Sequence, residues 1–248
     1  MSRVPGKRAR YTTLPHLVVP DGTVEALKWL ALILMTGDHI NKYLFNSTLP
    51  VLYEIGRLAM PLFAFTLGYN LARQSTLERG VYERTMTRLI VFGLAATPAF
   101  IALNGLVAGG WPLNVMFTLL AATATLYLIE KGGTGHQITA GAVFVTAGSL
   151  VEFLWPAMAL CAAVWWYRKQ PTWLALFLLL AATTALWFIN SNLWALAALP
   201  ILLGARCIDL CVPRLRWAFY AYYPLHLVAL CLIRIPMSQA GYFFINET

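Results

Sequence analysis

Long apolar stretches, separated by short polar connections, follow one another along almost the whole chain. We predict helices over these stretches, because a helix needs roughly 20 apolar residues to cross the ~30 Å hydrocarbon layer of a membrane. The predicted ranges are 24–45, 50–71, 86–107, 112–130, 137–155, 156–168, 171–189, 192–206 and 215–235. The sixth and eighth ranges are short for a full crossing, so eight or ten spans remain alternatives. The pattern predicts an all-α polytopic membrane protein, a bundle of about nine transmembrane helices.

The composition excludes a soluble globular domain. Of the 248 residues, 60% are hydrophobic and 11% are charged, and the mean hydropathy is +0.68. A net charge of +8 would suggest nucleic-acid binding in a soluble protein, but basic loops orient membrane proteins. We therefore predict membrane lipids, and no nucleic acid, as partners. The sequence has no zinc-ligand pattern and no glycine-rich phosphate loop, so we predict no metal.

The distribution of basic residues predicts how the chain lies in the membrane. Residues 1–23 are basic and contain three prolines, so we expect a poorly ordered cytoplasmic tail before a single transmembrane helical domain over 24–248. Lysines and arginines fall in alternate connections, and the segments 46–49, 104–111, 190–191 and 236–248 contain none. Because basic loops stay inside, the N-terminus is expected in the cytoplasm and the C-terminus outside.

Titratable side chains interrupt several of the predicted spans. At a helix centre each charge opposes insertion by ~2.5–3.5 kcal/mol, which suggests that a function retains them. The residues concerned are Asp38, His39, Glu54, Arg57, Glu152 and His226.

The depths of these residues indicate one shared site. His39 and Arg57 each lie nine residues from Thr48, the centre of a short turn, so they occupy one level of an antiparallel hairpin. At 1.5 Å per residue, His39 and Glu152 lie about 22 Å from the inner helix ends and His226 about 16 Å. A single polar site in the outer half of the membrane would accommodate them all.

The spacing of the charged residues also allows a purely structural role for them. Asp38 with Lys42, and Glu54 with Arg57, have the spacing of ion pairs on one helix face. Glu152 could simply be solvated near the membrane interface.

The residues that precede His226 favour a functional role for this histidine. Tyr222 and Tyr223 lie within one turn of the histidine, and Pro224 removes a backbone donor and disturbs the helix. A kink there would open room for a ligand.

Three stretches resemble the TraX family of conjugative-transfer membrane proteins, which includes the F-pilin acetylase and TrbP-type relatives. They are ALKWLALILMTGDHINKYLF, EIGRLAMPLFAFTLGYNLAR and FYAYYPLHLVAL. The strongest matches are residues 38–41, the run from Gly56 to Phe63, and the tyrosine-rich segment ending at His226. Together these stretches cover about a quarter of the chain, and the region 90–210 carries no comparable motif.

The resemblance implies an inner-membrane enzyme that transfers an acetyl group from acetyl-CoA to the N-terminal amine of a pilin subunit. By resemblance, His39, Asp38 and Arg57 are the expected reacting centre and His226 a further polar contributor. A neutral His39 held by Asp38 would accept the amine proton, and Arg57 would stabilise the oxyanion.

The remaining polar residues are assigned to substrate binding. For the acceptor they are Glu54, Asn41, Tyr223 and Glu152. For the phosphates of acetyl-CoA they are Arg84, Arg88, Arg214 and Arg216. Because acetyl-CoA is cytoplasmic, we expect its pantetheine arm to thread between helices from these arginines to His39.

Three other functions remain open: an extracytoplasmic O-acyltransferase acting on another acceptor, a transporter and a non-catalytic pilin-handling scaffold. A transporter would also bury titratable groups, but the paired broken helices of repeat-built carriers are not apparent. In a scaffold, the polar residues would only hold helices together. The acyl chain length and the oligomeric state are not predicted.

Overall fold

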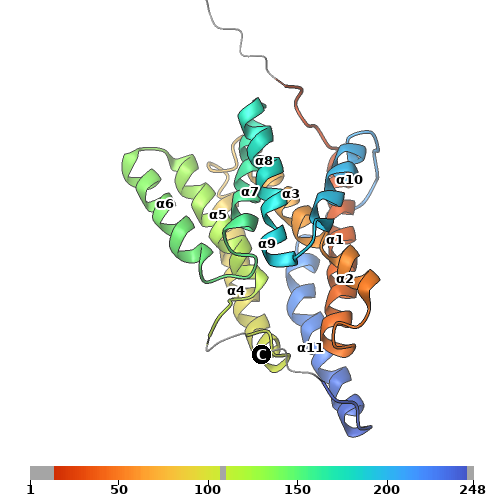
Figure 1. Ribbon diagram of the computed structural model, residues 1–248. Coiled ribbons are helices and arrows are strands. Elements are labelled where there is room, and N and C mark those ends of the chain that lie inside the picture. Colours follow the sequence, from red (N-terminus) through yellow and green to blue (C-terminus); the bar gives the residue numbers. More distant parts are fainter. Residues whose placement is uncertain (1–13, 107–109, 245–248) are drawn as a thin grey trace, which may run out of the picture.

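The computed structural model describes residues 14–106 and 110–244, and within them the chain is helical, with one isolated β-bridge between Leu113 and Val151 (Figure 1). In chain order the helices are α1 (Asp21–Leu44), α2 (Pro50–Gly56), α3 (Ala59–Leu71), α4 (Val81–Ala102), α5 (Val115–Lys131), α6 (Thr134–Gly148), α7 (Leu154–Lys169), α8 (Trp173–Ala185), α9 (Trp187–Asn190), the 3₁₀ helix η1 (Trp194–Ala197), α10 (Ala198–Ala205) and α11 (Ala218–Gln239). Each of the nine predicted apolar stretches is therefore helical.

Several helix boundaries differ from the prediction. The stretch 50–71 divides into α2 and α3, 171–189 into α8 and α9, and 192–206 into η1 and α10. Helix α1 begins at Asp21 rather than at residue 24, and the preceding Val19 is buried. The backbone N–H and carbonyl of Val19 both bond the hydroxyl of Tyr69, at 2.9 and 3.1 Å. Residues 1–13 of the expected tail lie outside the described residues.

Within residues 14–106 and 110–244, four helical segments are long and apolar enough to cross a membrane. They are Pro50–Leu71, Val81–Ala102, Trp173–Asn190 and Ala218–Gln239. Large apolar side chains also cover the surface, including Phe188 at 77% exposed and Ile138 at 69%. The chain is thus a helical membrane protein, while the nine crossings and the orientation of its ends stay predictions.

Local sequence explains where several helices begin. The side chain of Asn114 accepts a hydrogen bond from the backbone N–H of Met116 at 3.1 Å, and Thr172 accepts one from Ala175 at 3.2 Å. Such N-caps satisfy donors that the first helical turn leaves free. Gly80 precedes α4 with a φ of 60°, a left-handed conformation that glycine adopts without steric cost.

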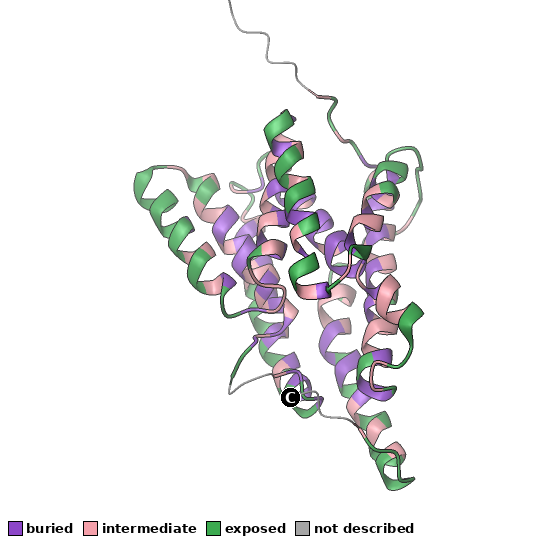
Figure 2. Ribbon diagram, viewed as in Figure 1, coloured by how far each residue is buried: buried purple, intermediate pink, exposed green. Residues whose placement is uncertain are grey.

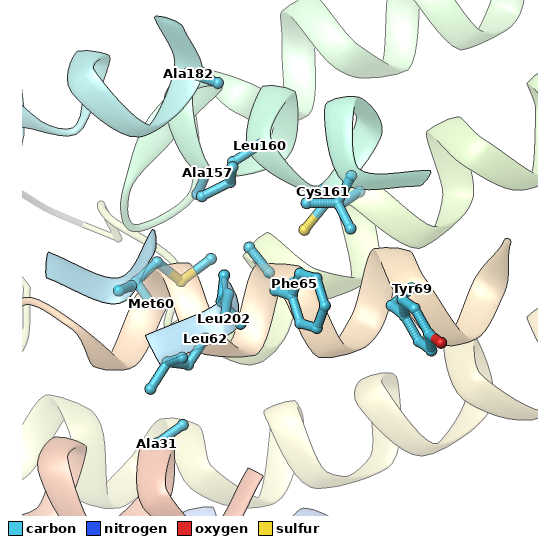
Figure 3. Packing of buried hydrophobic residues seen from close by; sticks show 14 of the residues in the cluster. Ala31, Met60, Leu62, Phe65, Tyr69, Ala157, Leu160, Cys161, Ala182 and Leu202 are labelled. Carbon is cyan, nitrogen blue, oxygen red and sulfur yellow. The ribbon is translucent and has the colours of Figure 1, made fainter. Parts of the chain in front are cut away.

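Helix α3 lies at the centre of the main core cluster and packs closely against α7 (Figure 3). Phe65 of α3 lies on the side of Cys161 of α7, whereas Leu62 points toward Ala31 of α1. A Cβ atom at Gly68 would come within 2.5 Å of the Cys161 carbonyl oxygen, so only glycine permits this approach. Close contact through small residues is how helices associate where the surroundings are already apolar.

A second core cluster joins α1, α4, α5 and α11 and supports the polar residues described below. Its buried members include Met35, Leu89, Met116, Tyr223 and Leu227. Helix α6, in contrast, packs mainly beside α5 and is exposed along most of its length (Figure 2). The bundle core therefore lies among α1, α3, α4, α5, α7 and α11.

Candidate active site

Two histidines from opposite ends of the chain meet between α1 and α11. His39 Nδ1 lies 2.7 Å from His226 Nε2, and the two rings are stacked at 15° with centroids 5.0 Å apart. His226 is buried and His39 half-buried. The predicted convergence of these two residues is confirmed, although 187 positions separate them.

The hydrogen bonds assign the tautomers of the histidine pair. His226 Nδ1 lies 3.0 Å from the carbonyl oxygen of Tyr222, and because a carbonyl only accepts, Nδ1 is the donor. In a neutral His226, Nε2 then accepts the Nδ1–H of His39. His39 is left with its lone pair on Nε2, the nitrogen that faces away from His226. The arrangement makes His39 Nε2 the basic atom of the pair.

A further contact holds α11 against α1 near the pair. The Thr36 hydroxyl donates to the Leu32 carbonyl at 2.7 Å and accepts from the Tyr222 hydroxyl at 2.7 Å. The Tyr222 ring in turn stacks on His226 at 15°. Helix α11 continues as one helix across Pro224.

Arg57 lies at the junction between α2 and α3, where it forms an ion pair with Asp38 of α1. Its Nε also donates to the Tyr53 carbonyl at 3.1 Å. A Cβ atom at Gly56 would come within 2.5 Å of the Asp38 Cβ, so the glycine lets the two helices approach closely. The residues Gly56 and Arg57 together create this contact.

This ion pair corrects two expectations about Asp38. The spacing suggested partners on the same helix, but among the described residues neither Lys42 nor Glu54 forms an ion pair. Asp38 was also expected to hold the tautomer of His39, whereas His226 occupies that position. The physical reason is rotation about the helix axis, since adjacent residues point about 100° apart.

Sequence reasoning missed two residues that hold Arg57. Asn190, which is 1% exposed, accepts a bond from Arg57 Nη1 at 3.4 Å, and its carbonyl accepts the Tyr53 hydroxyl at 2.8 Å. The Arg57 guanidinium lies 4.3 Å from the centroid of the Tyr53 ring. A polar residue at the end of an apolar stretch was the available signal, but residues 190–191 were interpreted as a loop.

The other residues assigned to acceptor binding lie in different surroundings. Asn41 is buried and accepts a hydrogen bond from the Leu49 backbone at 2.8 Å, which stabilises the turn between α1 and α2. Glu152, predicted within a span, lies in the connection between α6 and α7, and it interacts electrostatically with Lys42 and more weakly with Asp38 and Arg57. Glu54 lies on α2, half-buried.

A cavity of about 350 Å³ opens at one end of the bundle. All four arginines assigned to phosphate binding line it: Arg84, Arg88, Arg214 and Arg216. Three further cations line the same cavity: Lys28, Arg73 and Arg79. Apolar and aromatic side chains form the rest of its wall, among them Leu32, Phe63, Met116, Leu119 and Phe219. We call it the basic cavity.

Only some of these cations are neutralised. Lys28 pairs with Glu25 at 2.5 Å, and Arg73 pairs with Asp21 at 2.6 Å. Arg214 lies 3.6 Å from the same Glu25. Among the described residues, no ion pair forms at Arg79, Arg84, Arg88 or Arg216. Guanidinium groups without ion-pair partners around one cavity have the chemistry that suits a polyanion.

Tyr223 connects the basic cavity to the histidine pair. It lines the cavity and is only 2% exposed. Its ring centroid lies 5.3 Å from that of His226 and 6.4 Å from that of His39. A molecule that fills the cavity as far as Tyr223 therefore ends beside the histidines.

Fold and site define a helical membrane protein in which Tyr223 lies between a histidine pair and a basic cavity. The chain matches the TraX protein family over residues 23–234, which is most of its length. It belongs to this family, and its membership relates it to conjugative transfer.

One curated relative is an uncharacterised protein, RP591, of Rickettsia prowazekii (strain Madrid E). It is 41% identical over 70 residues, which cover 28% of this chain and 24% of the relative. The chain thus spans about a quarter of the length of the relative it matches. No solved structure matches the chain.

Proposed function

We propose that this protein is an acetyltransferase of the bacterial inner membrane, which moves an acetyl group from acetyl-CoA to the N-terminal amine of a conjugative pilin. The family supplies the link to conjugation. The observation that carries the proposal is Tyr223, because it lines the basic cavity and also touches the histidine pair. Tyr223 therefore lies where an acetyl donor bound in the cavity would meet the base of the histidine pair.

The basic cavity supports the donor side of the reaction. The uncompensated arginines suit the phosphates of the nucleotide half of acetyl-CoA, since guanidinium groups bind phosphate in a bidentate manner. The apolar wall formed by Leu32, Phe63 and Leu119 suits the pantetheine arm. Because basic segments stay inside, we place the open end of the cavity in the cytoplasm, where acetyl-CoA is present.

His39 provides the base for the transfer. Its Nε2 accepts a proton from the neutral acceptor amine while the amine nitrogen attacks the thioester carbonyl carbon. The tetrahedral intermediate then collapses, the carbon–sulfur bond breaks, and the thiolate of CoA takes the proton from His39. The products are an acetylated amine and the free thiol of CoA. His226 keeps the Nδ1–H of His39 engaged throughout, so that Nε2 is always the reacting nitrogen.

Arg57 is the candidate for stabilising the oxyanion. Three hydrogen bonds, to Asp38, Tyr53 and Asn190, fix the guanidinium in place. The group also acts electrostatically on His39, so it lies near the reacting centre. A preorganised cation adds most where water is excluded, as it is in a membrane interior. The pilin, itself a membrane-inserted subunit, would approach from the outer side or laterally through lipid.

Reconstitution with a pilin substrate tests the proposal. The purified chain in lipid nanodiscs is supplied with acetyl-CoA and a pilin peptide that has a free N-terminus, and the intact mass of the peptide is followed. We expect the increment of one acetyl group, and fragmentation that places it on the α-amine.

Controls identify the acceptor. A matched peptide with a blocked N-terminus should stay unchanged. If a hydroxyl group of the peptide is acetylated instead, the acceptor is an alcohol and the protein is an O-acyltransferase. If both the pilin peptide and acetyl-CoA stay unchanged, the acetyltransferase proposal is wrong, and a non-catalytic pilin-handling scaffold becomes the favoured function.

A further inference from the structure

An exposed tryptophan lies at the rim of the basic cavity. Trp217 is 61% exposed and directly follows Arg216, which lines the cavity. The Arg88 guanidinium lies 4.8 Å from the centroid of its ring. Phe92 contacts the indole on a tilt, with ring centroids 6.2 Å apart. The ring is therefore held in orientation while most of its surface remains open.

The residues around Trp217 extend this arrangement into the cavity. Tyr220 lines the cavity, stacks on Phe92 with centroids 6.0 Å apart, and also lies 5.7 Å from the Arg88 guanidinium. Arg88 is thus shared by two aromatic rings and has no carboxylate partner among the described residues. A flat aromatic group beside unpaired guanidinium groups suits a ligand that carries both a planar base and phosphates.

A second exposed tryptophan provides an internal comparison. Trp173 is 62% exposed at the start of α8, but it does not line the basic cavity, and no ring or cation contact involves it among the described residues. Membrane proteins place tryptophan at the interface as an anchor, and Trp173 fits that role. Trp217 differs from it by its fixed orientation and its position among phosphate-binding groups.

We propose that Trp217 is the platform on which the purine base of the donor nucleotide stacks, with Arg88 holding the indole from its other side. The inference rests on the proposed function, in which the donor is acetyl-CoA, and it assigns the base of that donor to a named side chain. It also divides the site into three parts: a base at Trp217, phosphates at the unpaired arginines, and a thioester beside Tyr223 and His39.

The test compares two donors. Acetyl-CoA carries the nucleotide, whereas S-acetyl-N-acetylcysteamine has the same thioester without it. We expect Trp217→Ala to raise the KM for acetyl-CoA about tenfold more than the KM for the nucleotide-free donor, since stacking on an aromatic ring contributes roughly that factor. Trp217→Phe, which keeps a ring, should restore most of the difference. Trp173→Ala is the matched control and should change neither KM.

A binding measurement separates this inference from the proposed function. Adenosine 3′,5′-bisphosphate should quench the tryptophan fluorescence of the wild-type and Trp173→Ala proteins and have little effect on Trp217→Ala. Equal quenching in all three proteins, or equal KM changes for both donors, would overturn the purine platform. Another outcome is that the nucleotide quenches the wild-type fluorescence in this way while the protein transfers acetyl from neither donor. In that case the acetyltransferase proposal fails and the purine site remains.

Discussion

The histidine pair with its neighbouring ion pair and the basic cavity both concentrate charge, but they do so in opposite ways. In the first region, His39 contacts His226 and Asp38 pairs with Arg57. In the second, Arg79, Arg84, Arg88 and Arg216 line one cavity and form no ion pair among the described residues. The charged groups of the first region have their partners within the protein, whereas several cations of the second have no ion-pair partner among the described residues.

The surroundings explain this difference. A charge inside a helical bundle must find its partner within the protein, because hydrocarbon offers none. A charge at an open cavity keeps water and counterions until a ligand replaces them. The paired region is therefore suited to chemistry, for which groups must be preorganised, and the unpaired region to reversible binding of a substrate. Substitutions in the two regions should affect different kinetic constants.

The largest effect is expected from His39→Gln. Without the basic Nε2, proton transfer loses a contribution of about 10²–10⁴-fold, so kcat should fall by about a thousandfold at nearly constant KM for acetyl-CoA. Pilin acetylation by the purified protein measures this. His136→Gln is the matched control, because His136 is exposed and its Nδ1 bonds the carbonyl of Gly132, just before its own helix. A His39→Gln protein with normal turnover would exclude His39 as the base.

Arg57→Met should lower kcat by roughly 10²-fold, because it removes a donor preorganised for the oxyanion. It should also destabilise the protein by about 3 kcal/mol, since Asp38 is left without its partner. The thermal unfolding of the protein in detergent measures the second effect. The double variant Asp38→Asn with Arg57→Met should recover part of the stability without recovering activity. If activity returned together with stability, Arg57 would have a purely structural role.

Two substitutions of His226 separate positioning from chemistry. His226→Ala leaves the Nδ1–H of His39 without its acceptor, and we expect kcat to fall about tenfold to a hundredfold as the favoured tautomer is lost. His226→Gln can place an amide oxygen near the same position and should restore much of the rate. Equal losses in the two variants would indicate that the imidazole itself takes part in the reaction.

Reasoning from the sequence correctly predicted the convergence of the histidines, because depth in a membrane helix follows from counting residues along it. The same counting failed for Asp38, whose partner depends on rotation about the helix axis. The break between α2 and α3 was also missed, because apolar residues continue on both sides of Arg57 and indicated one continuous span. The four assigned arginines come from two segments far apart in the sequence, α4 and the connection before α11, and only the folded bundle gathers them around one cavity.

In the basic cavity, Arg84→Ala should raise the KM for acetyl-CoA about tenfold and leave kcat nearly unchanged, because a phosphate contact is made equally in the ground state and the transition state. Added salt should reproduce part of this rise in the wild-type protein. Arg206→Ala is the control, since Arg206 is exposed and does not line the cavity. An equal rise for both variants would mean that overall charge, rather than the cavity, attracts the donor.

The smallest effect concerns the contact that aligns α11 with α1. Thr36→Val removes the acceptor of the Tyr222 hydroxyl and should lower stability by about 1 kcal/mol, with a fall in kcat of a few-fold as the two histidines separate slightly. Thr146→Val is closely matched, because both hydroxyls bond the carbonyl four residues earlier but Thr146 is exposed on α6. Any excess effect at Thr36 therefore measures the bond between the helices. If the two variants behave alike, helix packing alone holds His226 at His39, and the polar contacts around the pair contribute little to its alignment.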